Sequence, residues 1–169
     1  SRIEEFNSKG EYLAKFGSGN GSANGQFWNP RSIVADSKGN LWVADSSNYR
    51  IQEFNSKFEF VRKFGNGQGS GNGQFVEMQG LAEGPEGNIW VADSQNNRIQ
   101  EFSGEGAYLG QFGTAGNNDG QLHWPQGVAV DAKGNVWVAD TQNDRVQEFA
   151  ASEFIRKFGG DSSGAGQIS

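Results

Sequence analysis

Short segments in which apolar and polar residues alternate recur along the chain at a nearly constant interval. One begins with an arginine and ends with a phenylalanine, and its arginines are Arg2, Arg50, Arg98 and Arg145, spaced 48, 48 and 47 residues apart. A second segment, Trp-Val-Ala-Asp, keeps the same interval and starts at Trp42, Trp90 and Trp137. Alternation with a period of two predicts β-strands. A fixed period of this length, filled with short strands, is typical of β-propeller blades.

Each full repeat predicts four strands joined by short turns, and no segment has the helical period. The predicted first strands are 31–35, 79–83 and 126–130, and the second strands are 41–45, 89–93 and 136–140. The third strands are 50–54, 98–102 and 145–149, and the fourth are 59–64, 107–112 and 153–158. Between the first and second strands a glycine allows a tight hairpin turn. The chain is therefore expected to be all-β, built from four-stranded antiparallel blades.

The repeat count predicts an incomplete ring. Residues 1–24 supply the last two strands of one blade, three full blades occupy 25–72, 73–119 and 120–165, and 166–169 begin the next blade. Propellers close with four to eight blades, so we expect an arc of a larger propeller. The alternative is an open arc that a partner caps. In either case the open blade edges predict that the isolated chain aggregates or oligomerises.

The strand pattern also predicts the core. In Trp-Val-Ala-Asp the tryptophan and alanine point to one side of the sheet, and the valine and aspartate point to the other. A blade lies between two neighbours, so both of its faces bury side chains. We therefore expect Trp42, Trp90 and Trp137 to be buried at equivalent positions between blades.

Composition narrows the classes of function. The chain has 169 residues and a hydrophobic content of only 34%, but its 13 Phe and 5 Trp recur at fixed repeat positions, which predicts a folded protein. A net charge of −6 opposes nonspecific attraction to nucleic acid and to anionic lipid. No apolar run is long enough to span a bilayer. The absence of cysteine excludes disulfides and thiolate metal sites. We expect no nucleic-acid partner and no membrane insertion.

The repeated phrases resemble the NHL repeat family. They are Val-Ala-Asp-x-x-Asn-x-Arg-Ile/Val-Gln-Glu-Phe, present in every full copy, and Gly127-Val-Ala-Val-Asp-x-x-Gly-Asn135. The chain departs from the family at the histidine that follows the asparagine, where it has Tyr49, Asn97 and Asp144. The resemblance covers nearly the whole chain and implies a β-propeller, commonly six-bladed, that acts most often as an interaction surface. Some members of the family bind single-stranded RNA, some are lyases or lactonases, and bacterial members occur in large secreted or surface proteins.

Candidate catalytic and metal-binding residues are few. His123 is the only histidine, whereas a metal hydrolase needs several histidines and carboxylates that converge. Asp45, Asp93 and Asp140 recur in every copy with an asparagine and an arginine after them, which indicates a structural role in turns and ion pairs. The glycine-rich stretches 17–25 and 65–73 lack the lysine and the following helix of a phosphate loop and are interpreted as connectors between blades. We expect no catalytic residues, no metal and no cofactor.

The loops offer a better candidate site. The loop between the second and third strands and the loop between blades emerge at the same end of an antiparallel blade. Side chains there differ between copies and include aromatic, Met and Arg residues that are common in interfaces. The candidate binding residues are Trp28, Arg31, Tyr49, Met78, His123 and Trp124. The alternative is that Trp28 and Trp124 pack beneath the loops and staple neighbouring blades together.

These observations predict a noncatalytic protein-interaction module within a larger secreted or cell-surface bacterial protein. Its expected partner is another protein or further blades of the same protein. Three alternatives remain open: a structural repeat of an extracellular assembly, part of a lyase or hydrolase, and a single-stranded RNA binder. A cytoplasmic location also remains open.

Overall fold

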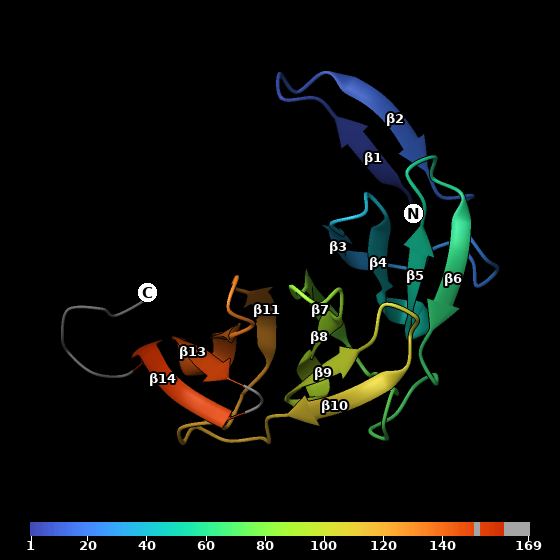
Figure 1. Ribbon diagram of the computed structural model, residues 1–169. Coiled ribbons are helices and arrows are strands. Elements are labelled where there is room, and N and C mark those ends of the chain that lie inside the picture. Colours follow the sequence, from blue (N-terminus) through green and yellow to red (C-terminus); the bar gives the residue numbers. More distant parts are fainter. Residues whose placement is uncertain (151–152, 161–169) are drawn as a thin grey trace.

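The repeated strand segments form four antiparallel sheets that follow one another along an open arc (Figure 1). The computed structural model describes residues 1–150 and 153–160. A two-stranded sheet comes first, with β1 (Ile3–Phe6) and β2 (Tyr12–Phe16). The expected start of a further blade at 166–169 lies outside the described residues. The expected architecture, an arc with three complete four-stranded blades and a half blade, is confirmed.

In each complete sheet the strands pair in chain order. The first sheet contains β3 (Pro30–Ala35), β4 (Leu41–Asp45), β5 (Arg50–Phe54) and β6 (Phe60–Phe64). The second contains β7 (Met78–Glu83), β8 (Ile89–Asp93), β9 (Arg98–Phe102) and β10 (Tyr108–Phe112). The third contains β11 (Pro125–Val130), β12 (Val136–Asp140), β13 (Arg145–Ala150) and β14 (Glu153–Gly159). Figure 1 shows β3, β7 and β11 on the inner side of the arc and β6, β10 and β14 on its outer side.

Strand ends and one kind of loop differ from the sequence prediction, and β6 and β10 begin one residue later than predicted. The first strands begin one residue early, because Pro30, Met78 and Pro125 already pair with the aspartates that end the second strands. After each second strand, one turn of 3-10 helix replaces the expected loop, at η1 (Ser46–Asn48), η2 (Ser94–Asn96) and η3 (Thr141–Asn143). Each turn ends at a residue with positive φ, namely Tyr49, Asn97 or Asp144. These are the positions where the chain departs from the family's histidine. Within the described residues, no helix is long or apolar enough to cross a membrane.

Small residues allow the inner strands of neighbouring sheets to approach closely. A Cβ atom on Gly80 of β7 would lie 2.5 Å from the carbonyl oxygen of Gln126 on β11. The equivalent position in β3 is Ser32, whose Oγ accepts a hydrogen bond from the backbone N–H of Leu81 at 3.0 Å. A larger side chain at Gly80 would therefore force the second and third sheets apart.

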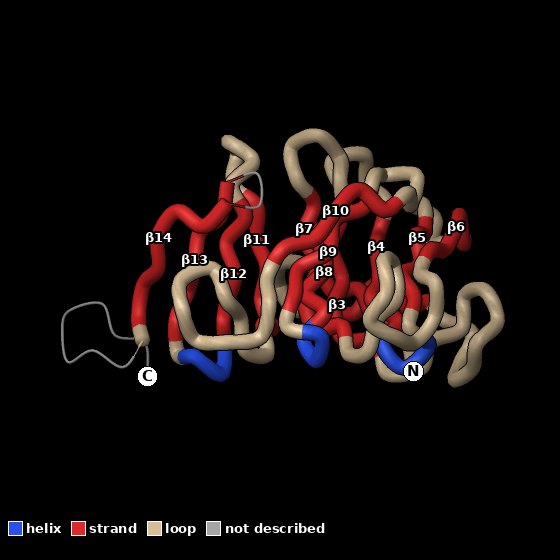
Figure 2. The backbone as a smooth tube through the Cα atoms, turned by 90° about the horizontal axis from the view of Figure 1, so that it is seen from below, coloured by secondary structure: helices blue, strands red, loops and turns tan. Residues whose placement is uncertain are grey.

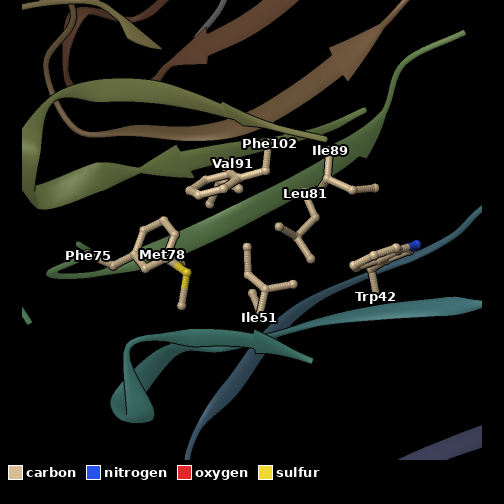
Figure 3. Packing of buried hydrophobic residues seen from close by; sticks show 9 residues of the cluster. Trp42, Ile51, Phe75, Met78, Leu81, Ile89, Val91 and Phe102 are labelled. Atoms are coloured by element: carbon tan, nitrogen blue, oxygen red, sulfur yellow. The ribbon is translucent and has the colours of Figure 1, made fainter. Parts of the chain in front are cut away.

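The core lies between adjacent sheets. Figure 3 shows Trp42 and Ile51 of the first sheet facing Met78 and Leu81 of the second. Trp90 of the second sheet packs in the same way in the cluster that joins it to the third. Burial of apolar surface between sheets is the main force that holds the arc together.

The expected burial is correct for two tryptophans and wrong for the third. Trp42 is 2% exposed and Trp90 is 7% exposed, but Trp137 is only partly buried. Trp137 lies on the face of the third sheet that points away from the second sheet. No further sheet among the described residues covers that face. Trp137 instead stacks on Phe158, with the guanidinium of Arg156 5.5 Å from its ring centroid. Trp137 thus occupies the same place in the repeat as Trp42 and Trp90 but has a different environment.

In the first and third sheets, the hairpin turn between the first and second strands is held by hydrogen bonds to an aspartate. Asp36 Oδ1 accepts hydrogen bonds from the backbone N–H groups of Lys38 and Asn40, and Asp36 Oδ2 accepts one from Trp42 Nε1 at 3.0 Å. Burial alone would raise the pKa of Asp36, but these hydrogen bonds outweigh it and hold the pKa below its usual value. Asp131 does the same in the third sheet, with a lowered pKa.

The second sheet has Gly84 at this position, and we expect Gly84→Asp to raise the free energy of unfolding by about 0.5–2 kcal/mol. Asn88 would have to turn away, because its Oδ1 lies 2.2 Å from a Cβ built on Gly84. That oxygen is buried and has no hydrogen-bond partner in the described part of the chain. The new carboxylate would accept the hydrogen bonds that Asp36 accepts. Urea denaturation measures the change.

The pH dependence of the free energy of unfolding shows whether the gain comes from hydrogen bonds to a carboxylate or from a change in the shape of the turn. We expect the fold to lower the pKa of the new aspartate, as it does for Asp36. The gain in the free energy of unfolding is then fully present above the pKa of an aspartate in the unfolded chain, about 3.9. It is lost as the pH falls through the lowered pKa of the folded protein. Gly84→Asn is the matched control, because its amide does not titrate. Equal gains from Asp and Asn at every pH would contradict the prediction.

Candidate functional site

The candidate site is a row of loops at one end of the arc, here called the loop face. It consists of the segments 28–31, 46–49, 76–79, 94–97, 123–126 and 141–144, and Figure 2 shows its three 3-10 turns along the same side of the molecule. Backbone hydrogen bonds join the two kinds of loop within each repeat, for example from the N–H of Ser47 to the carbonyl of Trp28 at 3.1 Å. The expectation that these loops share one end is therefore correct.

A buried aspartate fastens the loops in each repeat. Asp45 is fully buried, and its Oδ1 accepts a hydrogen bond from the backbone N–H of Trp28 at 2.7 Å. Its Oδ2 accepts hydrogen bonds from Asn48 Nδ2 at 2.9 Å, Arg50 Nε at 2.7 Å and Gln52 Nε2 at 3.1 Å. Both oxygens are thus used within the fold, and the carboxylate is structural.

Arg50 also fixes the glycine-rich segment that connects the two-stranded sheet to the first complete sheet. Arg50 Nη1 donates to the carbonyl of Ser22 at 2.6 Å, and Nη2 donates to the carbonyls of Ala23 and Gln26, both at 2.9 Å. Asp93 with Arg98 and Asp140 with Arg145 repeat this arrangement, at 2.8 Å and 2.6 Å. The glycine-rich stretches 17–25 and 65–73 are therefore clamped connectors between sheets, as predicted.

Sequence reasoning missed the glutamine of this network. Gln52 Oε1 accepts a hydrogen bond from the N–H of Gly25, and Gln52 Nε2 donates to the carbonyl of Gln26. Gln100 and Gln147 do the same in the later sheets. The available signal was the constant glutamine two residues after each of these arginines.

Trp28 and Arg31 lie exposed on the loop face. Trp28 is 59% exposed, so this residue is not a staple between sheets. Arg31 is also exposed, and its Nη2 lies 3.5 Å from Glu77 Oε1 of the neighbouring repeat. Tyr49 is half-buried against the core that joins the first two sheets, and its φ is +53°.

His123 and Trp124 occupy the next junction along the arc. His123 is exposed, and its backbone N–H donates to Asp140 Oδ1 at 2.6 Å. Trp124 is half-buried, and its backbone N–H donates to Asn97 Oδ1 at 2.8 Å. Its φ of +54° is unusual for a bulky side chain and is maintained by these surroundings. Trp124 combines an exposed part with a packed part.

Met78 does not belong to the exposed site, and this expectation is wrong. Its side chain is fully buried in the cluster between the first two sheets. Because β7 begins at Met78, this residue pairs with Asp93 and its side chain points into the core and not into the loop. The candidates that remain exposed are thus Trp28, Arg31 and His123, and Tyr49 and Trp124 are half-buried.

The loop face contains a shallow groove between the first two sheets. Its volume is about 320 Å³, and its lining includes Asn29, Arg31, Tyr49, Val76 and Glu77. The lining is mainly polar, with one charge of each sign and one aromatic ring. Among the described residues, no group of three or more His, Cys, Asp and Glu side chains is placed to hold a metal ion. The groove is thus suited to polar contacts with a partner side chain.

Comparison with protein families finds a match at two of the repeats. The NHL repeat model matches residues 27–54 and 122–149, which contain the first three strands of the first and third complete sheets. No curated protein matches the chain.

Solved structures share the fold at low sequence identity. A streptogramin B lyase matches with a TM-score of 0.71 and 16% identity over 99% of this chain and 50% of that one. A catalytically inactive virginiamycin B lyase from Staphylococcus aureus with quinupristin matches with a TM-score of 0.68 and 18% identity, over 98% and 50% of the two chains. A protein of unknown function from Bacteroides caccae matches with a TM-score of 0.59 and 16% identity, over 89% and 51%. The chain spans about half the length of these structures.

Proposed function

We propose that this chain, which carries NHL repeats in an arc of propeller blades, is a noncatalytic protein-interaction module whose partner binds the loop face. The observation that carries the proposal is the contrast between a uniform scaffold and variable loops. The Asp-Arg-Gln network is the same in all three repeats, whereas the residues that it presents differ. Such an arrangement holds changeable side chains on a rigid frame.

The chemistry of the loop face favours a protein partner. Trp28 is a large exposed aromatic, and aromatic and arginine residues supply most of the binding energy in protein interfaces. Arg31 and Glu77 line the adjacent groove and can pair with charged groups of either sign. A net charge of −6 speaks against single-stranded RNA as the partner. As part of this proposal, the module belongs to a larger secreted or cell-surface bacterial protein.

Substitution of Trp28 by Ser together with Arg31 by Glu is expected to abolish partner binding and leave the fold intact. Both side chains are exposed, so the free energy of unfolding should change by no more than about 0.5 kcal/mol for each. The measurement is photo-crosslinking to surface and secreted proteins from a probe placed at residue 47, followed by mass spectrometry.

Leu109→Ser is the matched control. Leu109 is a 54% exposed apolar residue on the outer strand β10, away from the loop face. The control should retain every crosslink that the double variant loses. If the double variant retains the crosslinks, or if the control loses them equally, the loop face is not the binding surface.

A lyase activity is the second candidate, favoured by the two lyases that share the fold. Identities of 16% and 18% carry the fold alone, and this chain spans half of each of those structures. Incubation with quinupristin, followed by mass spectrometry, separates the two proposals. Breakdown of the antibiotic would favour the lyase, and an intact antibiotic would favour the interaction module.

A further inference from the structure

The second sheet departs from its neighbours in one row of side chains that crosses three strands. In the first and third sheets the row consists of a tryptophan, a glutamate and an arginine on the second, third and fourth strands, namely Trp42, Glu53 and Arg62, and Trp137, Glu148 and Arg156. The second sheet keeps Trp90 and Glu101 but has Gly110 in place of the arginine. Residues directly opposite each other on neighbouring strands place their side chains on the same face. The row of the second sheet therefore lacks its positive charge.

The glutamate of this row is left without an arginine. Arg62 Nε lies 2.7 Å from Glu53 Oε2 in the first sheet, and Arg156 pairs with Glu148 in the third. Glu53 and Glu148 are buried, whereas Glu101 is half-buried. Within the described residues, Glu101 forms no ion pair. Its carboxylate is thus available to a cation from outside the chain.

A cavity of about 660 Å³ lies beside Gly110, between the second and third sheets. Trp90, Glu101 and Gly110 line it from the second sheet, and Val130 and Lys133 line it from the third. A Cβ atom on Gly110 would meet no other atom within 4 Å, so the place of the missing side chain is open space. Cavities of this volume are typical of sites for small molecules. Both walls belong to complete, adjacent sheets.

The charges of the cavity favour a single cation. Its charged lining residues are Glu86, Glu101 and Lys133, which give a net charge of −1. Glu86 and Lys133 are exposed, and Lys133 does not pair with Glu101. In the described part of the chain, Trp90 Nε1 donates no hydrogen bond, whereas the equivalent indole N–H groups of the other two sheets donate to aspartates. The cavity therefore offers an unpaired carboxylate, an indole ring and a free N–H group.

The third sheet shows how a guanidinium fits such a row. The guanidinium of Arg156 pairs with Glu148, and its central carbon lies 5.5 Å from the ring centroid of Trp137. A guanidinium is planar, so it can contact an aromatic ring and pair with a carboxylate at the same time. A compact, strongly hydrated ammonium matches this combination less well.

We infer that the cavity of the second sheet binds a guanidinium group of a ligand, which takes the place that arginine side chains occupy in the neighbouring sheets. Glu101 pairs with the guanidinium, and Trp90 packs against it. The ligand is either a small guanidinium compound or an arginine side chain of a peptide. The cavity includes the turn residues 85–88 and 133–135, so it lies at the opposite end of the sheets from the loop face. The inference is therefore independent of the partner proposed for the loop face.

The test measures dissociation constants by saturation-transfer difference NMR. This method follows the signals of the ligand, so it works whether the chain is a monomer or an oligomer. The guanidinium probes are n-butylguanidinium and the peptide acetyl-Gly-Arg-Gly-amide. The matched control ligand is n-butylammonium, which has the same charge and the same stem but no planar fork.

Three variants locate the bound cation. Glu101→Gln removes the unpaired carboxylate, and Glu86→Gln is its matched control because it removes an exposed carboxylate from the lining of the same cavity. Gly110→Arg supplies a guanidinium from the chain itself, as Arg62 does in the first sheet. Circular dichroism checks the fold of each variant. Gly110→Arg keeps the test decisive if Glu101→Gln does not fold.

Binding in the cavity predicts a definite order of affinities. At least one guanidinium probe should bind saturably and at least about 10-fold more tightly than n-butylammonium. Glu101→Gln should raise its dissociation constant at least about 10-fold, as expected for a lost hydrogen bond to a charged group. Glu86→Gln should raise it at most about twofold, because exposed charges interact weakly. Gly110→Arg should abolish binding.

The two probes separate the sources of the guanidinium. Tighter binding of the peptide identifies a peptide arginine, and equal or tighter binding of n-butylguanidinium identifies a small compound. The inference is wrong if neither probe binds saturably, if n-butylammonium binds equally well, or if Gly110→Arg retains full affinity. Equal effects of Glu86→Gln and Glu101→Gln would also overturn it, because they would indicate nonspecific attraction by charge.

Discussion

Replacing Asp93 with alanine is expected to lower the free energy of unfolding by about 3–5 kcal/mol, the usual cost of leaving one charge of a buried pair without its partner. Arg98 would remain buried, with its Nε no longer bonded to Asp93 Oδ2 at 2.8 Å. Asn96 Nδ2 and Gln100 Nε2 would also lose Asp93 Oδ2 as their acceptor, and the backbone N–H of Val76 would lose Asp93 Oδ1. Urea denaturation followed by circular dichroism measures the loss.

Glu105→Ala is the matched control, because it removes an exposed carboxylate from the turn between β9 and β10 of the same repeat. We expect it to change the free energy of unfolding by no more than about 0.5 kcal/mol. The double variant with Asp93→Ala and Arg98→Ala should cost less than the sum of the two single variants, since the residues share one network. Simple additivity would indicate that the two side chains stabilise the sheet independently.

Trp90→Ala should also cost about 3–5 kcal/mol, because it removes a large buried side chain from the core between the second and third sheets. Trp137→Ala provides the internal comparison. It occupies the same place in the repeat but is partly exposed, so we expect roughly half the cost. Equal costs for the two variants would contradict the unequal burial of the two positions.

The candidate site was predicted in part. The sequence identified the end of the blades where the loops gather. Among the side chains there, it identified Arg31 and Tyr49 at the groove, and His123 and Trp124 at the next junction, all of which are at least partly exposed. It also identified Trp28, which is exposed on the same face. It placed Met78 there as well, because strand boundaries are uncertain by a residue when only local pattern is used. Because the strand already begins at Met78, this side chain follows the alternation of the strand and points into the core.

Repetition is what made the rest of the fold predictable from sequence alone. Alternating residues and turn glycines are local signals, and three copies of each signal confirm one another. The recurrence of Asp45 with Arg50 in every copy likewise separated a structural ion pair from a catalytic one, because a residue needed by every blade stabilises the blade.

Only the tertiary structure decided which repeat positions are covered. Trp90 and Trp137 have the same local sequence, but among the described residues only Trp90 has a sheet packed over it. Arg2 and Arg50 likewise begin the same phrase, but in the part of the chain that the structure describes only Arg50 pairs with an aspartate. Local sequence determines backbone conformation through turn chemistry and side-chain alternation, whereas burial depends on contacts between sheets that are far apart in the chain.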